Sequence, residues 1–179
     1  YNEFYKHIGH DWQPPRLTIH WSAEGTSEFK GLVFVPEHAP LDLFHPDQKL
    51  GMNLYIKRVF ITSECRELVP DYLRFLKGVV DSSDLPLNIS RETLQKNPVL
   101  ERIKKNVTKK VLDALELQMK NEREQYIGFY KEFGKVLKEG VHMDFDNRDR
   151  IAKLLLFRSN KSGSDGWRSF QDYVDAMPE

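Results

Sequence analysis

The chain has 179 residues, and its 27 lysines and arginines balance 27 aspartates and glutamates, so the formal net charge is zero. Without net charge there is no overall field to attract nucleic acid or an anionic membrane, and neither is expected as a partner. No apolar run approaches the roughly 20 residues of a membrane span. The single cysteine, Cys65, excludes an internal disulfide and fits a reducing compartment, so we expect a cytoplasmic protein. The chain opens on Tyr1 without an initiator methionine, so we expect a fragment of a longer protein.

The first half of the chain is typical of a β-sheet. Residues 17–21, 28–35 and 53–61 are rich in β-branched and aromatic side chains, and each is predicted to form one strand. Residues 36–51 are predicted to form an exposed loop. A helix is expected next, with Pro70 in its first turn, and Cys65 at its start is interpreted as structural. Its apolar face carries Leu68, Tyr72, Leu73, Phe75 and Leu76. Val79 and Val80 mark a further strand.

The second half is predicted to be helical. A short helix with Ser90 as its N-cap should break at Asn97 and Pro98. Three amphipathic helices should follow, and Gly140 is expected to end the second. Their apolar stripes are Val99, Ile103, Val107, Val111 and Leu115; then Tyr126, Phe129, Tyr130, Phe133 and Leu137; then Ile151, Leu154 and Leu155.

Strands followed by a helical array predict an α/β fold. We expect residues 1–95 to form an αβα sandwich with the sheet, and residues 96–160 to form its helical continuation. Residues 161–179 begin with a Gly- and Ser-rich stretch typical of a flexible linker, followed by the start of a further segment.

A self-contained active site is not evident in the sequence. There is no GxxxxGK[ST] loop to cradle phosphates. Residues 144–149 have two positions of a calcium loop, but Arg148 replaces the third ligand, so a solvated turn is expected. His38 and His45 lack the spaced partners of a metal site, and no metal site is predicted.

The most informative segment is residues 78–95, where a strand gives way to a polar loop and a helix start. Arg91 lies in the first helical turn, where the helix dipole disfavours a cation. An arginine there indicates an anionic ligand shared with the backbone N–H groups. The alternative is a surface arginine that pairs with Asp81 or Asp84.

Several motifs, in this order, resemble the middle domain of the heat-shock protein 90 family, and the match covers nearly the whole chain. The amino-acid sequence at residues 4–7 and 81–84 resembles the bacterial members of the family more than the eukaryotic ones. The motifs are Glu3-Phe4-Tyr5-Lys6 with Asp11-Trp12, Glu24-Gly25 with Glu28-Phe29, Ala39-Pro40 with Asp42-Leu43-Phe44, Leu54-Tyr55, Arg58-Val59-Phe60-Ile61, Pro70-Asp71-Tyr72-Leu73, the segment 78–95, and Asp172-Tyr173-Val174.

The resemblance implies an αβα sandwich, similar to the second domain of ribosomal protein S5, followed by a helical coil. It implies that ATP with magnesium binds mainly to a separate N-terminal domain, and that Arg91 reaches the terminal phosphate when the two domains dock. Gln95 matches a second catalytic-loop residue, and Asn88 matches a third polar position. The fragment alone is then expected to be inactive towards ATP.

The resemblance also implies a surface for unfolded or partly folded client proteins. Trp12 matches a client-contacting residue of the family, while Leu41 and Phe44 extend this predicted surface. Whether Trp12 is exposed or folded onto the sheet stays open. Further implied partners are the N-terminal nucleotide-binding domain, a C-terminal dimerisation domain of the same protein, and co-chaperones. The rival hypothesis is a non-catalytic protein-interaction module in which Arg91 is structural.

Overall fold

The computed structural model describes residues 1–25, 28–45, 51–88, 91–94, 97–160, 163 and 166–177, with Arg91 and Glu92 described by their backbone alone. The chain divides into two compact units, Tyr1–Val111 and Leu112–Glu179. The division falls inside the long helix α3 (Pro98–Asn121), whereas the sequence places the end of the sandwich at residue 95.

The first unit is built on one five-stranded sheet with the order β1-β2-β5-β3-β4. Neighbouring strands are antiparallel except β3 and β5, which run parallel. The strands are β1 (Leu17–Ala23), β2 (Phe29–Val35), β3 (Met52–Ile56), β4 (Val59–Cys65) and β5 (Lys77–Ser82). β5 is therefore the central strand, and the predicted loop leaves the sheet from its end.

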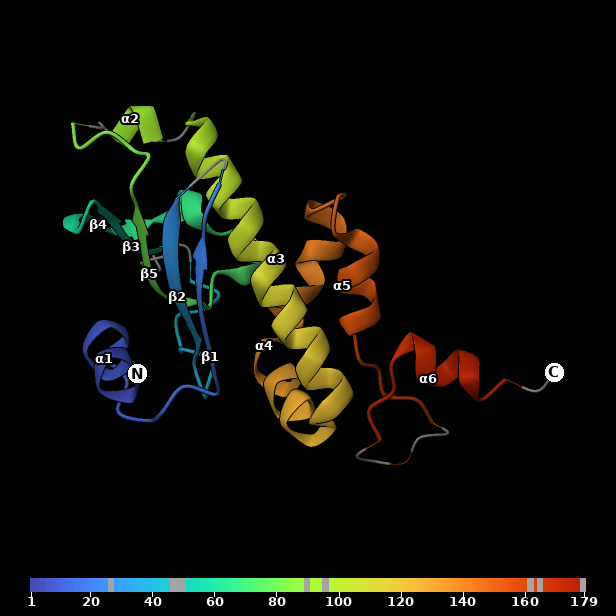
Figure 1. The fold of residues 1–179 in the computed structure, drawn as a ribbon. Helices are drawn as coiled ribbons and strands as arrows, with labels where there is room; N and C mark the ends of the chain where they lie inside the picture. Colours follow the sequence, from blue (N-terminus) through green and yellow to red (C-terminus); the bar gives the residue numbers. More distant parts are fainter. Residues whose placement is uncertain are drawn as a thin grey trace. The chain divides into compact units, whose positions relative to one another are not determined.

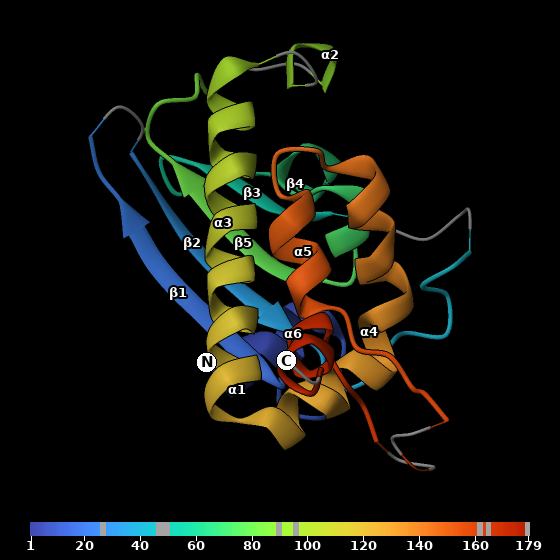
Figure 2. The ribbon, with the colours of Figure 1, turned by 90° about the vertical axis from the view of Figure 1, so that its right-hand side faces the viewer.

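Helices cover both faces of this sheet. On one face, α1 (Asn2–Gly9) places the buried ring of Tyr5 with its centroid 5.2 Å from that of Phe34 on β2. On the other face, the indole N–H of Trp21 on β1 donates to the side-chain oxygen of Asn106 on α3 at 2.9 Å. Figures 1 and 2 show α1 and the first part of α3 on opposite sides of the strands. The layers confirm the predicted αβα sandwich.

The third predicted strand, residues 53–61, is wrong as a single element. The chain reverses at Lys57 and Arg58, and β3 pairs with β4 as an antiparallel hairpin. Both turn residues have positive φ angles, 51° and 67°. Tight hairpins need this conformation and usually take it with Asn and Gly. A Lys-Arg pair does not indicate a hairpin turn, so the turn could not be predicted from these residues.

The helix predicted around Pro70 is also wrong. Two 3₁₀ turns, η1 (Arg66–Leu68) and η2 (Asp71–Leu73), replace it. Val69 between them is extended, with φ −139° and ψ 149°. A residue before proline is driven out of the helical region by the proline ring, which explains the interruption. Cys65, expected at a helix start, is instead the last residue of β4.

The second unit contains α4 (Arg123–Met143), α5 (Arg148–Leu154) and α6 (Phe170–Asp175). The predicted apolar stripe of α4 is buried. The expected stop at Gly140 is wrong, because α4 continues to Met143 and the carbonyl of Gly140 accepts the N–H of Asp144. Within residues 144–149, the side-chain amide of Asn147 donates to the Asp144 carboxylate at 2.9 Å in the turn before α5.

Charged contacts connect the helical segments of this unit. Arg150 on α5 donates to Asp113 at 2.6 Å and to Glu116 at 2.9 Å. The hydroxyl of Tyr126 donates to the carbonyl of Leu154 at 2.5 Å, which satisfies a buried polar group.

No helix among the described residues is both long enough and apolar enough to cross a membrane.

The structure has a short helix near each terminus that the sequence analysis did not predict. α1 and α6 were not predicted, because short helices carry few turns of hydrophobic periodicity. α6 is nevertheless well defined locally, since Ser169 accepts the N–H of Asp172 and the Asp172 carboxylate accepts the N–H of Ser169. Of the predicted flexible linker, residues 161, 162, 164 and 165 lie outside the described residues.

The close approach of β5 and β2 allows a test of the sheet. A Cβ on Gly78 would lie 2.3 Å from the carbonyl oxygen of Leu32. We expect Gly78→Ala to lower the free energy of unfolding by about 3 kcal/mol through overpacking. Gly25→Ala is the control, because Gly25 also has a positive φ but a Cβ there meets no atom within 4 Å. Denaturant unfolding of both variants checks this, and equal losses would contradict the steric explanation.

Candidate functional site

The loop between β5 and α2 (Arg91–Leu94) carries the residues that the sequence predicts to be catalytic. Two leucines anchor it to the first unit: Leu85 is buried, and Leu94 is 5% exposed beside Thr62 and Glu64 of β4. Leu87 lies between these anchors with 52% of its surface exposed. The loop is therefore held at Leu85 and Leu94, and residues 86–88 after the first anchor are exposed.

The predicted catalytic residues lie along this loop. Arg91 is the first residue of α2, as the sequence predicted for a helix start, and Asn88 is exposed in the preceding loop. Gln95 lies outside the described residues, as does the expected N-cap Ser90. The described residues thus give the backbone position of Arg91 and the exposure of Asn88, while the grouping of the three side chains stays a prediction.

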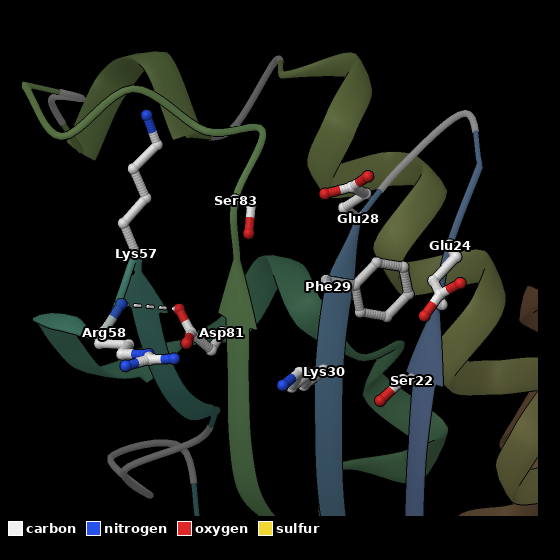
Figure 3. A pocket seen from close by; sticks show the side chains of 10 residues that line it. Ser22, Glu24, Glu28, Phe29, Lys30, Lys57, Arg58, Asp81 and Ser83 are labelled. Carbon is white, nitrogen blue, oxygen red and sulfur yellow. Dashed lines mark hydrogen bonds between the residues drawn. The ribbon is translucent and has the colours of Figure 1, made fainter.

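A surface depression lies where β5 passes into the loop. It is lined by three cations, Lys30, Lys57 and Arg58, and by three carboxylates, Glu24, Glu28 and Asp81. Lys57 and Arg58 lie on one side and Glu24 and Glu28 on the other, with Asp81 and Lys30 between them (Figure 3). The formal charges of these six side chains balance, so the depression carries no excess of positive charge that would favour a triphosphate.

Trp12, left open by the sequence, is 89% exposed. Its position is set by Asp11, which accepts the hydroxyl of buried Tyr5 at 2.9 Å and the backbone N–H of Gln13 at 3.0 Å. Desolvation, followed by the nearby Asp11 carboxylate, raises the pKa of Tyr5 and keeps its hydroxyl a hydrogen donor. Trp12 therefore follows a residue that is held by two hydrogen bonds, and it lines a surface depression together with Glu3, Lys6, His7 and His10.

Leu41 and Phe44 lie on a second exposed turn. Leu41 is fully exposed and Phe44 is 59% exposed, while Leu43 between them is buried. Arg74 holds this turn, since its side chain donates to the Leu43 carbonyl at 3.2 Å and lies 5.5 Å from the Phe44 ring centroid. Within the described part of the chain, no ring contact or hydrogen bond joins Trp12 to Leu41 or Phe44. We therefore treat them as two surface elements.

Comparison with known proteins decides the family. The family described as "Hsp90 protein" matches residues 1–179. This chain belongs to the Hsp90 family. It is similar to the chaperone protein HtpG of Geobacter sulfurreducens, with 55% identity over all of this chain and 28% of that protein. The HtpG of Geobacter metallireducens is 53% identical over 99% of this chain and 27% of its own length. The chain thus spans under a third of the curated relatives that it matches.

The structural comparison agrees. The middle domain of a putative heat shock protein from Plasmodium falciparum matches this Hsp90 chain with a TM-score of 0.87 and 30% identity, over all of this chain and 69% of that chain. The sandwich and the helices that follow it are therefore those of an Hsp90 middle domain.

The sequence analysis did not predict which residues hold the loop of this Hsp90 domain, and it named Asp81 and Asp84 only as possible partners of Arg91. Leu85 and Leu94 are its buried anchors, and Asp81 and Asp84 accept backbone N–H groups at its start. The burial of Leu85 could have been predicted, because it is an apolar residue in a polar stretch. Nothing in the sequence indicated which backbone N–H groups the two aspartates accept.

Among the described residues, no group of three or more histidine, cysteine or acidic side chains could hold a metal ion.

Cys65 is unsuited to nucleophilic chemistry. Burial, and then the neighbouring Glu67 carboxylate, raise the pKa of its thiol to about 12. Only the thiolate is a strong nucleophile, so the folded domain holds Cys65 in its unreactive form at neutral pH.

We therefore expect thiol-reactive probes to label Cys65 slowly in the folded protein. At about pH 8 the rate with a maleimide should be at least about 100-fold lower than in guanidinium chloride, because the unfolded thiol titrates near its ordinary pKa. Above that ordinary pKa the unfolded state ionises and the folded state does not, so Cys65 lowers stability as pH rises towards about 12. Equal labelling rates in the two states would contradict the buried, protonated thiol.

Proposed function

We propose that this chain is the middle domain of an ATP-dependent molecular chaperone that assists protein folding. In this proposal it supplies Arg91 to the ATP site of a separate N-terminal domain and contributes to binding unfolded client protein. The observation that carries the proposal is the membership of the whole chain in the Hsp90 family, together with the position of Arg91 at the first residue of α2, on a loop anchored by Leu85 and Leu94.

The proposed role of Arg91 follows from phosphoryl-transfer chemistry. The phosphate oxygens carry negative charge in the transition state, and a fixed cation stabilises it. Arginine suits this role better than lysine, because its guanidinium is always charged and presents a planar set of donors. An arginine that arrives only when two domains dock contributes to the rate constant and little to ATP affinity.

The other loop residues have supporting roles in the proposal. Gln95 would hydrogen-bond a phosphate oxygen or the attacking water, and Asn88 would shape the loop around Arg91. ATP and magnesium would be held mainly by the N-terminal domain. The complete protein would be a cytoplasmic homodimer joined through a C-terminal domain, with co-chaperones as further partners.

The client role rests on exposed side chains with rigid supports. Trp12 is 89% exposed on a turn fixed by Asp11, and Leu41 and Phe44 are exposed around buried Leu43. Aromatic side chains presented in this way supply contact area at low entropic cost and are common in binding hot spots.

The same exposure supports a second candidate function, a protein-interaction module without a catalytic role. Adding the chain to an isolated nucleotide-binding domain of the same protein distinguishes the two. Stimulated ATP hydrolysis supports the catalytic role, while client binding without stimulation supports the interaction module.

For the catalytic role, we expect Arg91→Ala in the full-length protein to lower turnover by about one to three orders of magnitude. ATP affinity should change little, because the nucleotide is held by the other domain. Arg91→Lys should rescue poorly, since lysine lacks the guanidinium fork. Steady-state hydrolysis and calorimetric titration with ATP-magnesium measure both quantities. Unchanged turnover in Arg91→Ala would return Arg91 to a structural role.

For the client role, we expect Trp12→Ala to weaken binding of an unfolded client by about 2 kcal/mol, the value of a hot-spot tryptophan. The free energy of unfolding should change by less than about 0.5 kcal/mol, because the indole is exposed. Phe145→Ala is the control, as Phe145 is also an exposed aromatic, at 76%, in the second unit. Client titration and denaturant unfolding are measured on both variants. A large stability loss with unchanged client affinity would place Trp12 in the core.

A further inference from the structure

Backbone hydrogen bonds from a neighbouring turn fix the start of the loop, residues 81–84, which we call the loop root. The N–H of Lys57 donates to the carbonyl of Ser82 at 3.0 Å, and the N–H of Arg58 donates to the Asp81 carboxylate at 3.0 Å. The second bond is drawn in Figure 3. The β3–β4 turn thus binds the last two residues of β5 from one side.

This turn is held in an unfavourable backbone conformation. Lys57 and Arg58 have φ angles of 51° and 67°, a region that residues other than glycine seldom occupy. Consecutive residues of this kind persist only where surrounding contacts determine them. Lys57 and Arg58 are the two central residues of the tight β3–β4 hairpin, which needs positive φ angles, and the bonds of their N–H groups to Ser82 and Asp81 add to the contacts that hold this turn.

The segment before β2 binds the loop root from the other side. The N–H of Ser83 donates to the carbonyl of Glu28 at 3.0 Å, and the N–H of Glu28 donates to the Asp84 carboxylate at 2.8 Å. A bond from an N–H to a carboxylate is charge-assisted and roughly twice as strong as a neutral one. Asp84 also donates its own N–H to the Ser82 hydroxyl at 3.3 Å, so it is tied to β5 as well.

We propose that Asp81 and Asp84 are positioning residues, whose carboxylates hold the loop root and thereby place Arg91 for docking. The proposal rests on the proposed function, in which Arg91 meets the terminal phosphate. Between the loop root and α2 the loop exposes Leu87 and Asn88 and has Leu85 as its buried anchor. A small rotation at the root would therefore move Arg91, and displacements of about 1 Å at a catalytic group can cost up to about 100-fold in rate.

Asp84 gives the sharper test, because it is exposed and its loss leaves the core intact. In the full-length protein we expect Asp84→Ala to lower turnover about fivefold, the value of one net hydrogen bond, with ATP affinity within about twofold of wild type. Asp84→Asn keeps an oxygen that can accept the N–H of Glu28 and should restore most of the rate. Glu24→Ala is the control, since Glu24 lines the depression beside Asp81 and Ser83 of the loop root, and its loss removes one negative charge without breaking a described hydrogen bond.

Hydrogen exchange of the Glu28 amide supplies a readout that does not depend on catalysis. In the full-length protein its exchange should be about fivefold faster in Asp84→Ala than in wild type and near wild type in Asp84→Asn and Glu24→Ala. A general structural loss would instead raise exchange across the sheet, including residues of β1.

Arg91→Ala, measured in parallel, separates the possible failures. If Arg91→Ala lowers turnover and Asp84→Ala does not, the positioning proposal is overturned and the proposed function stands. If neither variant lowers turnover, both are overturned. If Glu24→Ala lowers turnover as much as Asp84→Ala, the effect comes from charge and the positioning role is overturned. The positioning proposal is supported if Asp84→Ala both lowers ATP turnover and speeds exchange of the Glu28 amide, while Asp84→Asn and Glu24→Ala do neither.

Discussion

The pairing of β5 on both of its edges is the constraint on which the rest of the first unit depends. β5 is antiparallel to β2 and parallel to β3, and its approach to β2 leaves no room for a side chain at position 78. A shift of one residue in this register would exchange the two faces of the sheet, so the packing of Tyr5 on one face and Trp21 on the other requires it. The loop to α2 therefore starts from a fixed point.

The loop itself combines a start held by hydrogen bonds with an exposed stretch at residues 86–88. Its root is bound from the β3–β4 turn and from Glu28, while Leu85 and Leu94 bury apolar side chains on either side of the exposed segment. Such an arrangement fixes the chain on both sides of the segment that includes the backbone of Arg91, the first residue of α2. The neighbouring depression is lined by three cations and three carboxylates, so its formal charges balance.

The exposed aromatic residues follow a similar principle. Trp12 and Phe44 are presented to solvent on turns held by buried neighbours, Tyr5 and Leu43. A side chain on a rigid support loses little conformational freedom on binding, so more of its contact energy appears as affinity. A few exposed apolar groups on such supports could contact partners that lack a defined shape, such as partly folded proteins.

Sequence alone determined the fold class, the long helices and the candidate Arg91, because hydrophobic periodicity and specific motifs are local signals. It also predicted most of the buried apolar residues of α3 and α4, although Val99 is only half-buried and the buried Leu100, Leu112 and Val136 were not in the predicted stripes. The tertiary structure decided the β3–β4 reversal, the 3₁₀ turns around Pro70, the exposure of Trp12 and the partners of Asp81 and Asp84. These depend on contacts between segments distant in the chain. Lys57 and Arg58 adopt left-handed angles in a tight hairpin turn, and their N–H groups bond to the end of β5, a partner that no local pattern of residues reveals.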